Sequence, residues 1–223
     1  MSVIGSALPF FFGASKSSGP AIGDAYQGGF FAGYISHTAN SVATHALIVA
    51  PAATGATGTG YTLTTEKQWK TSNTTTAGTT SSFNGAANTA AIVTAGIADH
   101  PAAQFCTGLS IGGYTDWYLP ARDELEIAYY NLKPTTTSND PGSGANAYSV
   151  PARGSNYTLG NPAQTTVTAF KTGNSEAFIA DAHWSSTEVT AGFTAVHFFS
   201  AGNQGDNSKA VTNHVRAFRK VAL

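Results

Sequence analysis

The motif closest to a catalytic signature is Gly108-Leu109-Ser110-Ile111-Gly112, which matches the G-x-S-x-G pattern of a nucleophilic serine. That pattern works in hydrolases because the serine lies on a sharp turn that follows a strand and precedes a helix. Here a segment of helical composition precedes Ser110 and a Gly-Gly-Tyr turn follows it. We therefore interpret Gly108 as the end of a helix and not as part of a nucleophile site.

The histidines and the single cysteine do not follow a metal-binding pattern. Cys106 has no second cysteine with which to form a disulfide, a CxxC pair or a zinc-thiolate site. The histidines are dispersed, without the H-x-x-x-H spacing that places two imidazoles on one helix face. We expect no metal and no cofactor. The six histidines are His37, His45, His100, His183, His197 and His214.

Three acidic residues close in sequence, Asp123, Glu124 and Glu126, are candidates for general acid and base chemistry. Consecutive positions of a helix point in different directions, so these carboxyls need not face one substrate. Acidic residues in a first helical turn are stabilised by the helix dipole. We interpret them in that way and expect that the protein is not an enzyme.

Composition narrows the class of protein. The chain has 223 residues, 11 basic and 12 acidic, and only 10% of its residues are charged. Without a basic excess it is poorly suited to nucleic acid, and we expect no membrane span. An apolar run over residues 3–12 lacks a preceding Lys or Arg and contains Pro9, unlike an export signal. We expect residues 1–19 to be an apolar arm that buries Phe10, Phe11 and Phe12 in a pocket of its own domain or of a neighbouring subunit.

The elements that must position any site form a mixed pattern. Short aromatic or β-branched runs predict strands over residues 28–36 and 45–50. A long polar stretch over residues 51–85 follows. Helical composition then marks residues 86–95 and 100–109.

The clearest helix starts near Pro120. Its Leu125, Ala128, Tyr129 and Leu132 follow the i, i+3, i+4, i+7 pattern of a buried helix face.

The C-terminal third predicts a β-meander. We expect residues 134–173 to form surface loops, with strands over residues 182–186, 193–200 and 210–221 and a turn between the last two. In the last strand an apolar set alternates with a polar set, which favours a sheet that is covered on one face only. The apolar set is Val211, Val215, Ala217 and Val221, and the polar set is Thr212, His214, Arg216 and Lys220.

Several sequence blocks resemble those of one family. They are IGDAYQGG at residues 22–29, HALIVAP at residues 45–51, GGYTDWYLP at residues 112–120, HWSSTE at residues 183–188 and VRAFR at residues 215–219. In this order they resemble the family built around the C-terminal domain of a Legionella collagen-like adhesin. The resemblance runs from about Ile22 to the end of the chain.

This resemblance implies an α+β, C-type-lectin-like fold of the variety found in formylglycine-generating enzymes. Such a fold has a small twisted antiparallel sheet, two or three helices and long irregular loops. The chain lacks the paired active-site cysteines of the enzyme branch and the motifs of the calcium-dependent lectins. We therefore expect residues 20–223 to form a single C-type-lectin-like domain that binds rather than catalyses.

The shared motifs also suggest structural roles. We expect Trp117, Leu119, Trp184 and Phe218 to lie in the core, because large aromatic side chains are usually buried. Asp116 and Glu188 are expected to bind backbone groups or two arginines of the C-terminal strand. The motif residues are Asp116, Trp117, Leu119, Pro120, Trp184, Glu188, Arg216 and Arg219.

The candidate ligand-binding residues lie on the turn over residues 202–209 and on an outward face around His197. Their amide and carboxylate groups are suited to hydrogen bonds with a sugar or a peptide. These candidates are His197, Asn203, Gln204, Asp206 and Asn207.

We expect a structural protein of a tailed-phage virion, a tail-fibre or decoration protein, whose arm anchors it and whose loops face outward for attachment to the host. Its expected partners are other virion proteins, copies of itself and a glycan or receptor of the host surface. One alternative is a carbohydrate- or glycosaminoglycan-binding adhesin, free or on the bacterial cell surface. A second alternative is a hydrolytic enzyme.

Overall fold

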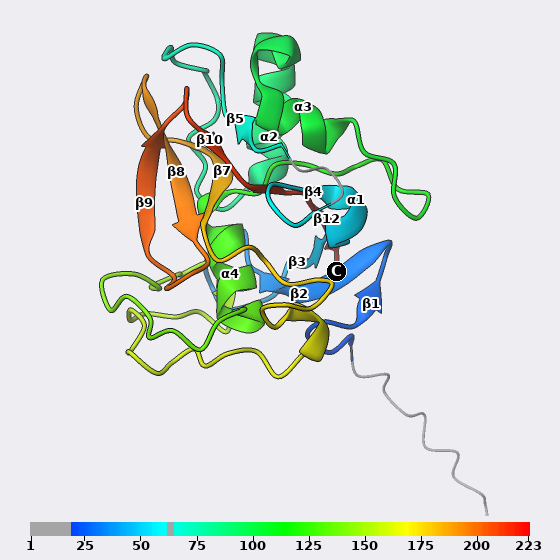
Figure 1. Cartoon of the computed structure of the whole chain (residues 1–223), viewed down its shortest axis with the longest axis vertical. Coiled ribbons are helices and arrows are strands. Elements are labelled where there is room, and N and C mark those ends of the chain that lie inside the picture. The colour runs from blue at the N-terminus through cyan, green and yellow to red at the C-terminus, as the bar shows by residue number, and fades with distance from the viewer. Residues whose placement is uncertain (1–18, 62–64) are drawn as a thin grey trace, which may run out of the picture.

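Strands from both ends of the chain meet in one antiparallel sheet. The computed structural model describes residues 19–61 and 65–223 (Figure 1). In this sheet β2 pairs with β3, and β3 pairs with β12, while β1 and β6 both pair with β2. The five strands are β1 (Ala25–Tyr26), β2 (Gly29–Ile35), β3 (His45–Val49), β6 (Ser149–Val150) and β12 (Phe218–Ala222).

The two strands predicted near the N-terminus are confirmed as β2 and β3. Successive side chains of a strand point to opposite faces of the sheet. Leu47 and Ile48 of β3 therefore face opposite sides, and both are fully buried. The near-continuous apolar run of β3 is the pattern of a strand that is covered on both faces.

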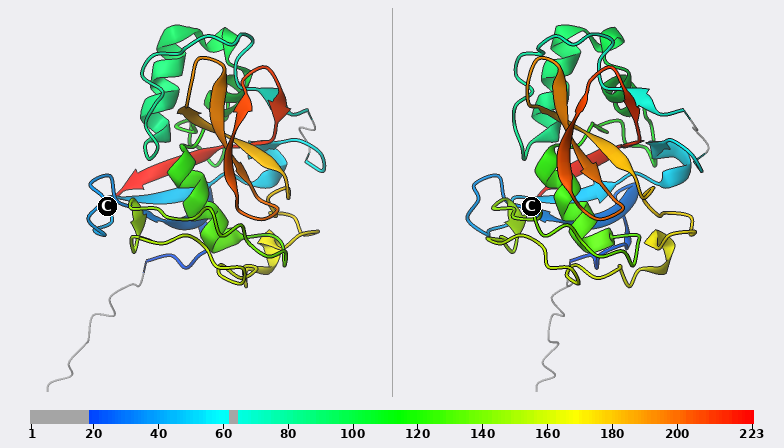
Figure 2. Two further views of the ribbon diagram at one scale, coloured as in Figure 1. Left: turned by 90° about the vertical axis from the view of Figure 1, so that its left-hand side faces the viewer. Right: turned by 60° about the vertical axis from the view of Figure 1, so that its left-hand side comes forward.

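Helix α4 (Arg122–Leu132) covers one of these faces (Figure 2). The predicted helix is confirmed, and its apolar positions Leu125, Ala128, Tyr129 and Leu132 are all buried. At its start Glu124 accepts hydrogen bonds from the backbone N–H of Ala121 at 2.8 Å and of Gly85 at 3.2 Å. Glu124 thus satisfies donors that the first turn of a helix leaves unpaired.

Helices α2 (Gly85–Gly96) and α3 (Pro101–Thr107) contribute to the core on the other face, and they confirm the two predicted helical segments. Asn84 caps α2 through a hydrogen bond from the backbone N–H of Ala87. Proline at the first position of α3 costs no hydrogen bond there. This part of the core also contains three tryptophans, which are Trp69, Trp117 and Trp184.

A second antiparallel sheet has the strand order β7-β8-β9, with β7 (Ala182–Glu188), β8 (Phe193–Phe198) and β9 (Gln204–Ser208). The first two strands of the predicted meander are confirmed. The third is wrong, because β9 occupies the segment that was predicted as a turn. Short polar residues form β9, and its pairing with β8 rests on backbone hydrogen bonds that side-chain patterns do not reveal.

The segment 210–221, predicted as one strand, is divided among three partners. Its strand β10 (Thr212–Asn213) pairs with β5 (Lys67–Gln68), and β11 (Val215–Arg216) pairs with β4 (Ala56–Thr57). Only β12 joins the larger sheet.

The predicted alternation along segment 210–221 is also wrong. Arg216 is fully buried, whereas Val211 is 45% exposed. The reason is that both sides are covered only over residues 213–219. There β11 pairs with β4, and His214 bridges to His183 of β7.

The polar stretch over residues 51–85 is held by buried charges. It contains α1 (Ala52–Gly55), and η1 (Ile97–Asp99) follows α2. Lys209 is fully buried, lies 2.8 Å from Glu188 Oε2 and also donates to the carbonyl of Thr74. Glu188 in turn accepts from the backbone N–H of Thr76. A loop that looked unstructured in sequence is thereby tied to the β7–β8–β9 sheet.

The chain combines helices with curled antiparallel sheets, which is an α+β arrangement. In the described part of the chain, every helix is too short or too polar to cross a membrane. The predicted anchoring residues Phe10, Phe11 and Phe12 lie outside the described residues.

Candidate functional site

Three surface hollows lie along one segment, residues 133–181, which connects α4 to β7 and which we call the loop layer. Figure 2 shows these yellow-green loops gathered on one side of α4. The loop layer contains η2 (Thr168–Phe170) and the short strand β6, and it is otherwise irregular. Long irregular segments in folded domains are often functional.

Buried polar side chains hold the first half of the loop layer. The ammonium group of Lys133 donates to the carbonyls of Thr137 and Pro162 and to Asn139 Oδ1. The amide of Asn139 donates to the carbonyls of Thr158 and Pro162 at 3.0 and 2.9 Å. Both side chains are about 2% exposed. These bonds fix two distant turns against the end of α4.

A second polar anchor is Glu126, which is fully buried on α4. Its carboxylate accepts from Asn146 Nδ2 at 2.6 Å and from the Tyr157 hydroxyl at 2.7 Å, and it forms an ion pair with Arg153. Burial raises the pKa of Glu126. Because all three partners belong to the loop layer, one helix residue orders three separate loops.

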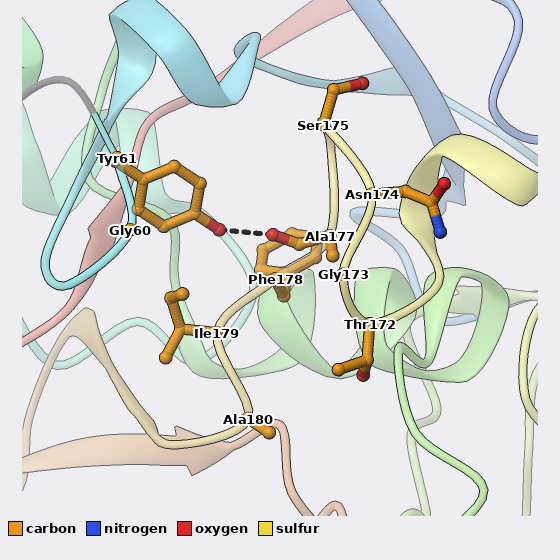
Figure 3. A pocket seen from close by; sticks show the side chains of 10 residues that line it. All are labelled: Gly60, Tyr61, Thr172, Gly173, Asn174, Ser175, Ala177, Phe178, Ile179 and Ala180. Carbon is orange, nitrogen blue, oxygen red and sulfur yellow. Dashed lines mark hydrogen bonds between the residues drawn. The ribbon is translucent and has the colours of Figure 1, made fainter.

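Hollow A has a volume of about 380 Å³ and is lined by Gly60, Tyr61 and residues 172–175 and 177–180. Figure 3 shows Gly60 and Tyr61 on one side of the hollow, while the remaining labelled residues come from one stretch of the loop layer, residues 172–180. The Tyr61 hydroxyl donates to the carbonyl of Ala177. Phe178 and Ile179 supply apolar surface, and Thr172 and Ser175 supply hydroxyls.

The walls of hollow A are held by a buried ion pair behind it. Arg216 is fully buried, and its guanidinium lies 2.9 Å from Glu176 Oε2 and 4.9 Å from the Phe178 ring centroid. The lining of hollow A contains no carboxyl, imidazole or amino group. Burial raises the pKa of Tyr61, so its hydroxyl stays protonated. Hollow A is therefore suited to an uncharged ligand with both polar and apolar parts.

Two further hollows lie beside α4. Hollow B, about 260 Å³, is lined by Tyr130, residues 152–157 and Asn161. Hollow C, about 360 Å³, is lined by Lys133, Thr136, Thr137 and residues 159–160 and 162–164. Residues of one turn contribute to both hollows, since Asn161 lines hollow B and Leu159 and Gly160 line hollow C.

The prediction of an outward face around His197 is wrong. His197 is fully buried, and its ring lies 5.0 Å from the ring of Tyr129 and 5.3 Å from that of Phe199. Neither imidazole nitrogen has a hydrogen-bond partner among the described residues. Burial lowers the pKa of His197 to about 3. The cause is that α4 covers the face of β8 that was taken as open.

The other four predicted ligand-binding residues lie on or beside β9, away from the three hollows. Asp206 is exposed, whereas Asn203, Gln204 and Asn207 are half-buried. Asn207 donates to Asn213 Oδ1 at 3.3 Å, and the backbone N–H of Gln204 donates to Ser143. The predicted hairpin loop is an edge strand, and these side chains line none of the three hollows.

The predicted motif residues connect the elements. Trp117, Leu119 and Trp184 lie in the core. The indole of Trp184 donates to the carbonyl of Lys67, and that of Trp117 to the carbonyl of Tyr114.

The acidic motif residues have different partners. Arg219 donates to Asp116 at 2.6 Å, as expected for that pair. Glu188 binds the backbone of Thr76 and Lys209 instead of an arginine. Pro120 accepts from the backbone N–H of Ser186 and so joins the start of α4 to β7.

The candidate nucleophiles do not lie in catalytic surroundings. Ser110 follows α3 and not a strand. Cys106 is fully buried, and burial raises the pKa of its thiol. Within residues 19–61 and 65–223, no group of three His, Cys, Asp or Glu side chains is arranged to hold a metal ion.

Comparisons with known proteins add no assignment. No protein-family model matches this chain. No curated protein matches it either.

Hollows B and C were missed as candidates because the whole stretch over residues 134–173 was interpreted as plain surface loop. Most of hollow A is formed by residues 174–180, for which the sequence predicted no element. One signal was present. Asn, Thr, Ser, Gly and Pro recur over residues 134–173 together with Tyr148 and Tyr157, and this mixture is typical of binding loops.

Proposed function

We propose that this chain is a structural protein of a tailed-phage virion whose lectin-like body displays the loop layer outward for attachment to the host surface. The observation that carries the proposal is the gathering of three hollows on one ordered loop segment. Hydroxyl, amide, backbone and aromatic groups form most of their lining. These groups suit the hydroxyls and apolar faces of sugars better than they suit catalysis.

A C-type-lectin-like fold is part of this proposal. Three features support it besides the resemblance of the sequence blocks. Strands near both ends of the described chain pair in one sheet, helix α4 packs on that sheet, and a long loop segment leads from α4 to the second sheet. In such an architecture the sheets and helices form a rigid base, and the loops carry the binding function.

The proposed anchor is the apolar arm. Three adjacent phenylalanines, Phe10, Phe11 and Phe12, are costly to leave in water, at roughly 1.5–3 kcal/mol for each side chain. We propose that they dock on other virion proteins or on copies of this chain. We propose that the body presents the loop layer to the host while the arm is attached.

The anchor is tested by replacing Phe10, Phe11 and Phe12 with serine in the full chain and measuring co-sedimentation with virions. We expect the variant to stay folded and monomeric by light scattering and no longer to co-sediment with virions. If the variant and the wild type sediment with virions equally, the anchoring proposal is wrong.

The same observation of the loop layer also favours a free or cell-surface adhesin, which binds glycans without a particle. An absence of virion association combined with glycan binding through the loop layer would select this second candidate. Glycan binding through the loop layer is common to both candidates, so the arm experiment separates them.

A further inference from the structure

Hollow B contains an arginine whose guanidinium is only partly used. A guanidinium carries five N–H donors. Arg216 donates through Nε, Nη1 and Nη2, and Arg219 donates through Nε and Nη1. Within the described part of the chain, Arg153 donates through Nη2 alone, to Glu126. Its Nε is buried without a partner among residues 19–61 and 65–223, so the donors that remain for a ligand are those of Nη1 and the second N–H of Nη2.

The guanidinium of Arg153 is also held in one orientation. Its Cζ atom lies 4.1 Å from the centroid of the Tyr130 ring, and Glu126 binds the Nη2 end. The side chain is 16% exposed. A planar guanidinium stacked on an aromatic ring loses little freedom when it binds a planar acceptor such as a carboxylate.

The ion pair with Glu126 leaves some N–H donors of Arg153 unpaired among the described residues. The carboxylate of Glu126 also accepts hydrogen bonds from Asn146 and Tyr157, and Glu126 does not line hollow B. Two neutral donors thus share the stabilisation of this buried charge. Arg153 is left as the cation of the hollow, and the lining contains no carboxylate.

The other two hollows lack such a group. The lining of hollow A contains no cationic side chain. In hollow C the ammonium group of Lys133 is 2% exposed and donates to Thr137, Asn139 and Pro162, which uses its three N–H groups. Among the three hollows, only hollow B offers a cation with free donors.

We propose that hollow B binds the carboxylate of an acidic sugar residue, a uronic acid, through Arg153. Ser155 and Asn156 line the same hollow and supply a hydroxyl and an amide for the sugar hydroxyls. A volume of about 260 Å³ suits one sugar residue. The inference rests on the proposed function, because it names the ligand class for one part of the loop layer.

The test is a titration of the ¹⁵N-labelled full chain with D-galacturonic acid and, in parallel, with neutral D-galactose. We expect galacturonic acid to shift the signals of residues 152–157 and of the Arg153 side chain. We expect galactose to bind there about 10-fold more weakly, which is the loss of one charge-assisted hydrogen bond. Equal binding of the two sugars would show that the sugar carboxylate has no role in binding. This comparison uses the wild-type chain alone.

Arg153→Lys keeps the charge of the buried pair and removes the planar fork. We expect it to weaken galacturonic acid binding about 10-fold while the spectrum outside hollow B stays unchanged. Arg122→Gln is the matched control, because Arg122 is 44% exposed and lies outside all three hollows.

Besides equal binding of the two sugars, two further outcomes overturn the inference. One is the absence of any signal shift with galacturonic acid up to its solubility limit. The other is binding that Arg153→Lys leaves unchanged. The proposed function would survive either outcome if a bacterial polysaccharide still bound at hollow A.

Discussion

The hydroxyl of Tyr129 donates to Asn139 Oδ1 over 2.7 Å, and this bond joins the core face of α4 to the first turn of the loop layer. Asn139 also accepts from Lys133 and donates to the carbonyls of Thr158 and Pro162. One amide thus connects a helix with two turns, and the shape of hollow C depends on it.

Replacing Asn139 with alanine should therefore lower the free energy of unfolding by about 2–3 kcal/mol. The change leaves the Tyr129 hydroxyl without its acceptor and removes one hydrogen bond each from Lys133 and from the carbonyls of Thr158 and Pro162. Urea denaturation measures the change, and hydrogen exchange should quicken in residues 133–139 and 158–162. Asn73→Ala is the control, since Asn73 is exposed. A loss below 0.5 kcal/mol, within the range of ordinary surface substitutions, would contradict this role.

The two arginine ion pairs of the C-terminal segment should differ in their contribution to stability. Glu176→Ala leaves the fully buried Arg216 without its carboxylate, which costs about 3–5 kcal/mol. Asp116→Ala removes a partner that is 55% exposed, and Arg219 keeps its contact with the Tyr114 ring at 3.8 Å. That change should cost less than about 1 kcal/mol. Thermal and urea unfolding of both variants provide the comparison, and equal losses would refute it.

Replacing His197 with leucine should stabilise the protein. The wild-type imidazole is buried with both nitrogens unpaired, which costs about 1–3 kcal/mol relative to an apolar side chain. We expect the free energy of unfolding at pH 7 to rise by about 1–2 kcal/mol. His45→Leu is the comparison, because His45 is half-buried and its Nδ1 lies 2.9 Å from Thr44 Oγ1. A lower free energy of unfolding in His197→Leu would contradict this and would indicate that the imidazole has a hydrogen-bond partner in the folded protein.

Stability should rise with pH between about pH 4 and pH 6. Burial lowers the pKa of His197 to about 3 and of His37 to about 4, so the unfolded chain, with ordinary values near 6.5, binds protons that the folded chain does not. Their stabilising contribution is complete above pH 6.5 and is lost as the pH falls. Burial raises the pKa of Glu124 to about 7, and its contribution is lost as the pH rises from 4.5 to 7.

Burial raises the pKa of Glu126 as well, so it acts in the same direction as Glu124. The histidines should outweigh these two carboxyls, because burial also lowers the pKa values of His45, His100 and His183. Urea denaturation at several pH values measures the slope. In His197→Leu the slope near pH 5 should fall by about 1.4 kcal/mol per pH unit, which corresponds to one proton. An unchanged slope would mean that His197 does not titrate on unfolding.

Filling hollow A should abolish binding there without disturbing the fold. Ser175 and Ala180 line the hollow and are exposed, so Ser175→Trp or Ala180→Trp places an indole in the space that a ligand would occupy. We expect at least a 10-fold loss of affinity for a bound polysaccharide and a change in unfolding free energy within about 0.5 kcal/mol. Affinity that stays the same in both variants would exclude hollow A as the binding place.

Local patterns in the sequence were sufficient for α4, β2 and β3. Leu125 and Leu132 repeat at helical spacing, and residues 46–49 of β3 are all apolar, so each element is defined by its own residues. The failures all involve partners that are distant in sequence. Arg216 is buried because Ala50 and Glu176 satisfy it, and no pattern around residue 216 reveals them.

The candidate site was harder to predict than the fold for the same reason. His197 was expected on an open face, and it is covered by Tyr129 from a helix 68 positions earlier in the chain. The hollows depend on Asn139 and Glu126 anchoring loops across the surface. Such hydrogen-bond networks are specified by single polar residues without periodicity, so they emerge only in three dimensions.

The most direct test is binding of the full chain to an array of bacterial surface polysaccharides, with Ser175→Trp, Arg153→Lys and Asp206→Ala measured beside the wild type. The loop layer as the ligand-binding surface predicts that the wild type binds a subset of the polysaccharides. It also predicts that one or both loop-layer variants lose that binding, whereas Asp206→Ala on the edge strand β9 retains it. Binding that only Asp206→Ala abolishes, or the absence of binding to any polysaccharide, would contradict the account.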